Sequence, residues 1–295
     1  MAWQPFLEVL VSSEQNWSSS GAAVNADKSV VKSVAKAFAV LQAFTTSEPE
    51  LVLAEVARAA KIDNATAHRF LNTLVGLGYV EKVAGSRRFR LTLKCLDLGF
   101  NAIARSDMRS LARPLLRSMV GPRIEAASIG VLDGGSVVYV ERIQAGLARL
   151  AVDIRVGNRV AAFSTALGRA ILSQMTPSEQ RAVLESGTLQ RLTPHTETEM
   201  GKLLELIAEA RERGYAVSDQ ETVAGLRVIA APIIDVDGYP IAAVSAAAPA
   251  FGRTLDEFIA DAREQVCDAA RKLSLALGAA GGTAGQRLSE TGSRS

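Results

Sequence analysis

The sequence predicts an α+β protein in which an N-terminal helix-turn-helix with a β-wing is joined by a helical linker to a domain with an antiparallel sheet. Three observations support this. Two helical patterns flank a tight connection within residues 53–75, an arginine-rich hairpin follows at 79–91, and strand patterns alternate with capped helices beyond residue 121. Strands joined mostly by hairpins, with helices at the start, middle and end, are typical of an α+β domain.

The helix-turn-helix begins with a short amphipathic helix over residues 53–60, whose apolar side chains have the spacing of one buried face. Residues 61–63 form the tight connection, and Asp63 or Asn64 can cap the free amides of a second helix over 64–75. This connection often contains a residue at positive φ, usually glycine. Lys61 occupies that place, at a cost on the order of 1 kcal/mol.

The second helix has a small, polar outward side. At about 100° per residue, its apolar residues 67, 70, 71 and 74 fall on the opposite side. In the major groove, Arg can read guanine, Asn can read adenine, and a methyl group can touch thymine. The alternative is a solvated helix face, the rule for surface helices. The residues of this helix predicted to contact DNA are Asn64, Ala65, Thr66, His68, Arg69, Asn72 and Thr73.

Positive charge is concentrated around this motif. Strands at 79–83 and 89–91 enclose a hairpin tip that carries Arg87 and Arg88, which with Lys61 are predicted to contact phosphates. Residues 30–94 contain ten Lys and Arg against five acidic residues, a net charge of +5, whereas the whole chain is +2. The charge therefore favours double-stranded DNA as a partner over a merely solvated helix.

Composition limits the class of protein. A chain of 295 residues with 48% hydrophobic content is long enough for two domains. Its apolar runs are shorter than the roughly 20 residues of a membrane span, and Cys95 and Cys267 are too few for a disulfide framework or a four-ligand zinc site. We expect a cytoplasmic protein with no membrane partner, metal or cofactor. Residues 1–29 show no basic leader and no small-residue cleavage site, and we interpret them as a flexible extension.

A third helix and a linker surround the motif. A helix over 33–44 is expected to close the back of the helix-turn-helix, and residues 45–50 are expected to form a loop. Helices over 93–105 and 106–120 form the predicted linker. Its apolar residues, such as Leu96 and Phe100, suit either contact between two chains or burial within one. The side of helix 33–44 expected to face the core consists of Val34, Ala37, Phe38, Leu41 and Phe44.

The predicted domains are residues 30–92, 93–120 and 121–278, followed by a disordered tail over 279–295. Thr176 and Glu179 form a capping box with proline at the first helical position. Strands are predicted at 126–132, 137–143, 147–154, 215–218, 227–235 and 241–247, and helices at 164–175, from 177, at 197–213 and from 255 to near Gly278.

Several motifs occur in an order that resembles the IclR family of bacterial transcriptional regulators over about residues 30–277. They are STALGRA at 164–170, GYAVSDQE at 214–221, GLRVIAAP at 225–232, and AVS at 243–245 with Pro249. DQE at 219–221, RLT at 90–92 and LDLG at 96–99 resemble the branch that controls aromatic-acid catabolism through the β-ketoadipate pathway. Effectors of that branch include protocatechuate, para-hydroxybenzoate and β-ketoadipate.

The resemblance implies a winged-helix head, a GAF-like effector domain, dimerisation through the heads and a tetramer that is a dimer of dimers. Three positions differ from relatives that bind small carboxylates, because Ser218 replaces an acid, Val228 a cysteine and Ala247 a serine. A less polar pocket suits an aromatic or longer acid. The residues that the resemblance assigns to effector binding are Thr165, Ala166, Leu167, Gly168, Ser218, Asp219, Val228, Ser245 and Ala247.

The residues themselves also indicate an anion site. Free amides at the start of the helix near Thr165 favour a carboxylate, and Arg149, Arg155, Arg159 and Arg227 can add charge, unless each forms a surface salt bridge. The main hypothesis is a DNA-binding regulator, not an enzyme, that responds to a small organic acid, aromatic or dicarboxylic.

Two other classes are weighed against this hypothesis. One is an enzyme acting on a carboxylate, for which the chain offers only His68 and His195 and contains no Gly-x-Ser-x-Gly elbow, phosphate loop or His-Glu-x-x-His pair. The other is an architectural DNA-binding protein that has no ligand.

Overall fold

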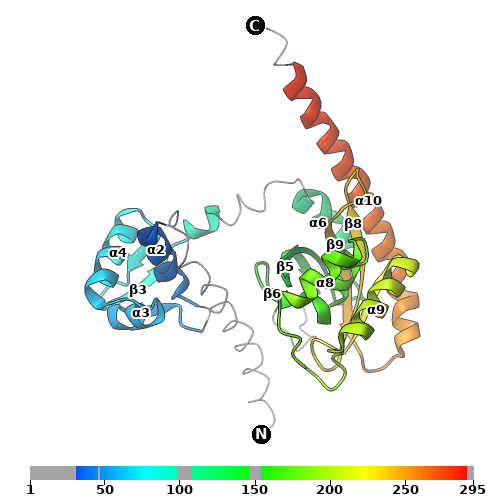
Figure 1. Ribbon diagram of the computed structural model, residues 1–295, viewed down its shortest axis with the longest axis horizontal. Coiled ribbons are helices and arrows are strands. Elements are labelled where there is room, and N and C mark those ends of the chain that lie inside the picture. Colours follow the sequence, from blue (N-terminus) through cyan, green and yellow to red (C-terminus); the bar gives the residue numbers. More distant parts are fainter. Residues whose placement is uncertain (1–30, 46, 99–107, 146–153, 291–295) are drawn as a thin grey trace. The chain divides into compact units, whose positions relative to one another are not determined.

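The computed structural model describes residues 31–45, 47–98, 108–145 and 154–290, and the described chain forms two compact units (Figure 1). The division between the units falls between residues 98 and 108, which are the nearest described residues on either side, and so lies within the predicted linker. The expected extension over 1–29, most of the first linker helix with Phe100, the expected strand over 147–153, and residues 291–295 lie outside the described residues.

The N-terminal unit is a helix-turn-helix with a three-stranded sheet of order β1-β3-β2. Strand β1 was not predicted, because residues 45–50 were expected to form a loop. A strand of three residues is too short to show an alternating pattern in the sequence. It forms by pairing with β3, where Leu51 lies opposite Phe89. The elements are α2 (Lys32–Gln42), β1 (Glu50–Val52), α3 (Leu53–Ala59), α4 (Asn64–Gly76), β2 (Val80–Lys82) and β3 (Arg88–Leu91).

Helix α2 closes this unit through a different stripe from the one predicted. Val40 and Phe44 are buried in the core with Leu71 of α4, whereas Val34 is 52% exposed and Phe38 is 53% exposed. At 3.6 residues per turn only one stripe of a helix faces a small core, and here that stripe runs through Val40. The expectation that Val34 and Phe38 are buried against the helix-turn-helix is therefore corrected.

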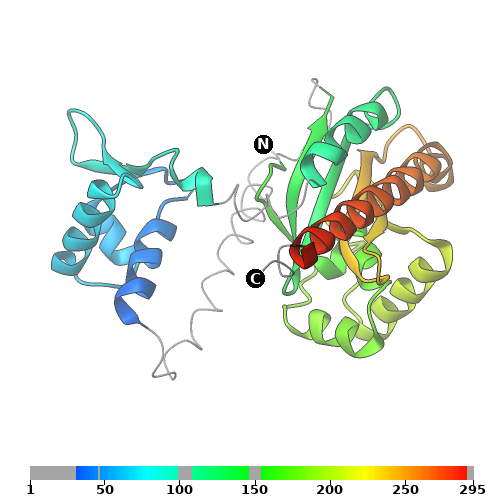
Figure 2. The same ribbon diagram turned by 90° about the horizontal axis from the view of Figure 1, so that it is seen from above.

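The C-terminal unit is an antiparallel six-stranded sheet of order β6-β5-β4-β9-β8-β7. Helices α6 and α10 lie on one face, and α7, α8 and α9 lie on the other (Figures 1 and 2). The elements are α6 (Met108–Met119), β4 (Ala126–Asp133), β5 (Ser136–Gln144), β6 (Arg159–Ala161), the 3-10 turn η2 (Ala162–Ser164), α7 (Ala166–Leu172), α8 (Pro177–Glu185), α9 (Met200–Arg213), β7 (Ala216–Asp219), β8 (Leu226–Ile234), β9 (Pro240–Pro249) and α10 (Leu255–Glu290).

Local signals in the sequence locate several of these elements. The capping box is present, since the Thr176 amide donates to Glu179 Oε2 at 2.8 Å, and α9 ends at Gly214 with φ 76°. The last helix was expected to end near Gly278 but continues to Glu290. Glycine weakens a helix by about 1 kcal/mol relative to alanine without stopping it, and this segment contains no proline.

Helix α7 packs so closely on the sheet that all seven of its residues are buried. A Cβ on Gly130 of β4 would lie 2.5 Å from Val137 and 3.0 Å from Leu167, so the glycine permits this approach. We call the side of the sheet that carries α7 the α7 face. No helix of the described residues combines the length and the apolar character needed to cross a bilayer.

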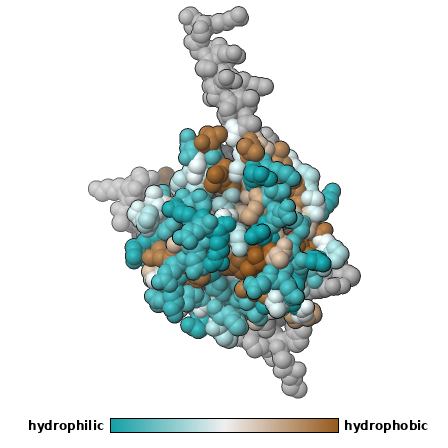
Figure 3. Space-filling view, turned by 90° about the vertical axis from the view of Figure 1, so that its right-hand side faces the viewer, coloured by the Kyte–Doolittle hydropathy of each residue, from teal (hydrophilic) through white to brown (hydrophobic). Residues whose placement is uncertain are grey.

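The face shown in Figure 3 is largely hydrophilic, with apolar residues near the top of the view and a further group near its centre. Val236 and Tyr239 at the β8–β9 turn and Leu275 of α10 are exposed apolar residues. The α7 face, in contrast, is covered by helices.

Candidate DNA-binding face and effector site

The turn before α4 has the predicted conformation. Lys61 adopts φ 53°, and the Asp63 carboxylate accepts hydrogen bonds from the Thr66 amide at 2.8 Å and the Thr66 hydroxyl at 2.6 Å. These two bonds lower the pKa of Asp63, so the carboxylate stays charged at the positive end of the helix dipole. Asp63 rather than Asn64 is therefore the cap.

The outward side of α4 is exposed as predicted. Arg69 and Lys61 form no ion pair with any residue that the structure describes, and the Asn72 amide lies 3.4 Å from His68 Nδ1. Thr66 is half-buried, and its hydroxyl bonds to Asp63. The inward side is formed by Ala67, Leu71 and Leu74. The exposed residues are Asn64, Ala65, His68, Arg69, Asn72 and Thr73.

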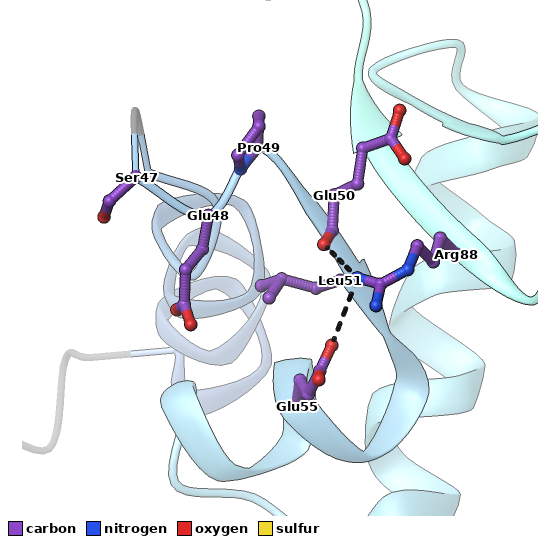
Figure 4. A pocket seen from close by; sticks show the side chains of 7 residues that line it. All are labelled: Ser47, Glu48, Pro49, Glu50, Leu51, Glu55 and Arg88. Carbon is purple, nitrogen blue, oxygen red and sulfur yellow. Dashed lines mark hydrogen bonds and ion pairs between the residues drawn. The ribbon is translucent and has the colours of Figure 1, made fainter.

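The two predicted arginines of the wing differ in their surroundings. Arg87 is exposed and has no partner among the described residues. Arg88 instead donates to the Glu50 carbonyl at 2.8 Å and lies 3.8 Å from the Glu55 carboxylate (Figure 4). Arg88 therefore links the wing to β1 and α3, and of the two arginines only Arg87 is exposed without a partner among the described residues.

A shallow depression of about 440 Å³ lies beside Arg88 (Figure 4). Three carboxylates line it, from Glu48, Glu50 and Glu55, against one guanidinium. Its net negative lining does not suit an organic acid.

The start of α7 offers fewer free amides than the sequence suggested. Thr165 Oγ1 accepts from the Gly168 amide at 3.0 Å, which leaves the amides of Ala166 and Leu167 without an acceptor among the described residues. Gly168 has a packing role, because a Cβ there would lie 2.1 Å from the Ala162 carbonyl oxygen. The structure thus assigns Gly168 to the contact between η2 and α7.

Ser218 and Asp219 are adjacent on β7 and point to opposite faces of the sheet. Ser218 is on the α7 face, where its hydroxyl donates to the Ser164 carbonyl at 3.0 Å. Asp219 accepts from Arg227 Nε at 2.8 Å on the other face. The structure therefore does not bring Asp219 or Arg227 to the α7 face.

Three further arginines were proposed as sources of charge. Arg159 of β6 lies 2.7 Å from Asp133 Oδ2. Arg155 is an exposed residue before β6, and Arg149 is outside the described residues.

A buried ion pair fixes the segment before α7. The Arg169 guanidinium binds both carboxylate oxygens of Glu221, with Nη1 at 2.6 Å from Oε1, and its Nε donates to the Phe163 carbonyl at 2.9 Å. Arg169 is 1% exposed. The pair holds η2 and the loop after β7 together.

Sequence reasoning missed a polar group on the α7 face of β4 and β5. Arg142 pairs across the strands with Ser128, and its Nη1 donates to Ser128 Oγ at 2.9 Å. Ser245 of β9 is the next residue in this cross-strand row. The local sequence does not reveal this row, because it depends on the register between strands that are far apart in the chain.

Models of known families match most of the chain. Residues 33–84 match the IclR helix-turn-helix domain, and residues 100–275 match the C-terminal domain of the bacterial transcriptional regulator IclR. The two matches follow the two structural units.

The chain is also similar to individual proteins. It is 33% identical to the HTH-type transcriptional regulator KdgR of Escherichia coli over 84% of this chain and 93% of KdgR. It is 32% identical to the Pca regulon regulatory protein of Pseudomonas putida over 76% of each chain. An IclR homolog from Microbacterium hydrocarbonoxydans, solved in complex with 4-hydroxybenzoate, superposes with a TM-score of 0.72 at 26% identity, over 84% of this chain and 99% of that one.

These matches agree with the structure, in which α4 has an exposed side, a wing follows it, and helices cover the antiparallel sheet of the C-terminal unit. The chain belongs to the IclR family of DNA-binding transcriptional regulators, whose C-terminal domain binds effectors.

Proposed function

We propose that this protein binds operator DNA through the outward side of α4 and the wing, and that a small organic acid bound on the α7 face changes the affinity for DNA. The observation that carries the DNA-binding part is the outward side of α4, where Arg69 and Asn72 are exposed and Arg69 has no internal partner in the described chain. An Arg and an Asn on such a helix can read guanine and adenine. Lys61, Asn64, Ala65, Thr66, His68, Thr73, Arg87 and Arg88 complete the proposed interface.

The proposed effector is an aromatic or dicarboxylic acid. The Microbacterium homolog contains 4-hydroxybenzoate, and Val228 and Ala247 give the α7 face an apolar patch that suits the body of such an acid. KdgR and the Pca regulon regulator are 33% and 32% identical to this chain, so we propose the class of the acid and not one member of it. The other proposed contacts are Thr165, Ala166, Leu167, Ser218 and Ser245.

We further propose that two chains associate through α2. Val31, Val34 and Phe38 are spaced three and four residues apart and are 61%, 52% and 53% exposed, which makes an apolar stripe on one side of a helix. Reading an operator with two half-sites requires two helix-turn-helix units held about 34 Å apart, so a second copy of the chain is the occupant that fits this stripe. The resemblance extends the proposal to a dimer of dimers.

Fluorescence anisotropy with labelled DNA from beside the protein's own gene tests the DNA-binding function. We expect specific binding whose affinity falls steeply with salt, because phosphate contacts release counterions. Arg69→Ala should weaken specific binding about 5- to 150-fold, corresponding to roughly 1–3 kcal/mol for a lost base contact.

Arg181→Ala is the matched control, because Arg181 is an exposed arginine of α8 whose ion-pair partner among the described residues is Glu185. Salt-insensitive binding by the wild type, or equal binding by both variants, contradicts the proposal.

A further inference from the structure

A row of polar side chains crosses the middle of the α7 face. Arg142 of β5 lies opposite Ser128 of β4, which lies opposite Ser245 of β9. Adjacent strands are about 4.8 Å apart, and directly opposite side chains have Cβ atoms roughly 5 Å apart. Because Arg142 Nη1 bonds to Ser128 Oγ at 2.9 Å, the guanidinium extends over β4 and toward Ser245.

A bulge in β5 brings Tyr139 to the same face. Ile129 pairs with Glu141 and Gly130 with Tyr139, so Val140 is the extra residue. Without the bulge, residues 139 and 142 would point to opposite faces, since successive strand residues alternate. Burial raises the pKa of the Tyr139 hydroxyl, and the positive charge of Arg142 acts against this rise. Arg142 is therefore close enough for its charge to act on that hydroxyl.

Two hydroxyls of this face are buried but have no hydrogen-bond partner in the described part of the chain. Ser245 is 3% exposed and Tyr139 is 6% exposed. Neither hydroxyl oxygen is among the described side-chain atoms that lack both a partner and any contact with solvent. Buried hydroxyls in proteins are nearly always hydrogen-bonded. Both are thus available to a bound molecule.

An apolar row lies next to this polar row. Ala126 of β4 pairs with Ala247 of β9, which pairs with Val228 of β8, and these residues pack with Leu226. Residues two apart on a strand are separated by about 6.6 Å. The face thus presents a cation and hydroxyls on one side and apolar groups on the other, within the span of a small acid.

We propose that Arg142 binds the carboxylate of the effector, with the hydroxyls of Tyr139 and Ser245 beside it, and that the body of the acid lies on the apolar row. This inference rests on the proposed function, because it concerns the same effector. A guanidinium forms paired hydrogen bonds with a carboxylate that a neutral side chain cannot form. Ser128 is a positioning residue, because it contacts the guanidinium.

Isothermal titration of the full chain tests this assignment with 4-hydroxybenzoate, protocatechuate and β-ketoadipate, and with 4-hydroxybenzamide as a neutral counterpart of the first. The wild type should bind an acid and discriminate against the amide. Arg142→Gln should bind the acid at least tenfold more weakly and lose that discrimination. The control Arg159→Gln, on the neighbouring strand, should behave as wild type because Arg159 is bound to Asp133.

Two conservative variants keep the test informative if Arg142→Gln does not fold. Tyr139→Phe removes one hydroxyl from a buried ring and should weaken acid binding severalfold without lowering the melting temperature. Ser128→Ala should weaken binding but retain the preference for acid over amide, since the guanidinium remains.

The outcomes separate this inference from the function on which it rests. If the wild type binds an acid and Arg142→Gln binds it as tightly as Arg159→Gln does, the assignment of Arg142 is overturned and the proposed function stands. Unchanged acid affinity in Tyr139→Phe overturns the role of that hydroxyl. If no acid binds the wild type or alters its DNA affinity, the acid-responsive function fails, and this inference fails with it.

Discussion

Replacing Arg169 with leucine should strongly destabilise the C-terminal unit. The guanidinium makes a two-pronged ion pair with Glu221 and also donates to the carbonyls of Phe163 and Val217, at 2.9 and 3.3 Å. Both partners are nearly inaccessible, with side-chain exposures of 2% and 10%. In Arg169→Leu, the Glu221 carboxylate would remain buried with the Glu197 amide, 3.3 Å away, as its only described donor.

The expected loss follows from these contacts. Removing one partner of a buried ion pair costs about 3–5 kcal/mol, because a buried charge is left uncompensated. For a unit of this length, each kcal/mol lowers the melting temperature by about 2–4 °C, so the expected decrease is roughly 6–20 °C. Replacing both residues, in Arg169→Leu/Glu221→Leu, should cost less than the two single losses combined.

Urea denaturation of the full-length protein, monitored by circular dichroism, measures these losses. The surface pair Arg181–Glu185 is the control: its atoms are 3.7 Å apart and its side chains are 55% and 57% exposed, so Arg181→Leu should cost less than about 1 kcal/mol. A loss below about 1 kcal/mol in Arg169→Leu, or strictly additive losses in the double variant, would refute the reasoning about this pair.

Three further predictions concern other parts of the chain. Gly168→Ala should lower the free energy of unfolding by about 1–3 kcal/mol, because the added methyl group would overpack against η2. Gly187→Ala is the control and should be nearly neutral in the same denaturation assay, since a Cβ there meets nothing within 4 Å. Phe38→Ser should shift the protein toward monomers in analytical ultracentrifugation and Lys36→Ser should not; equal masses for both variants would argue against association through α2. Hydrogen bonds lower the pKa of Asp63, so its carboxylate should stabilise α4 at any pH above the ordinary Asp pKa and lose this effect as the pH falls through the lowered pKa. Asp63→Asn should therefore show a smaller acid-induced loss of helix by circular dichroism. An acid transition identical to that of the wild type would contradict this role of Asp63.

Local signals in the sequence predicted the elements that depend on neighbouring residues. Asp63 bonds to an amide three residues away, and the left-handed Lys61 was expected from its place in the connection between the two helices. The outward side of α4 follows from the helical repeat alone. For these elements the physics is contained within one or two helical turns, which explains why the exposed side of α4 could be predicted almost residue by residue.

The proposed effector site depends on longer-range geometry, and the local sequence indicates only part of it. Asp219 adjoins Ser218 in the motif but points to the other face, where it binds Arg227. Arg142 reaches the α7 face through strand register and a bulge, neither of which leaves a local signal. The exposed Phe38 shows the same limit, because an apolar helix side looks alike whether it faces its own core or a second chain.

The most direct test of the central claim is one anisotropy experiment that compares Arg69→Ala and Arg142→Gln, using operator DNA with and without an acid that the wild type binds. A division of labour between the two units predicts that Arg69→Ala loses specific DNA binding but retains acid affinity. It predicts that Arg142→Gln binds DNA normally but no longer responds to the acid. Parallel loss of both activities in each folded variant would contradict the claim that DNA and effector are bound by separate surfaces.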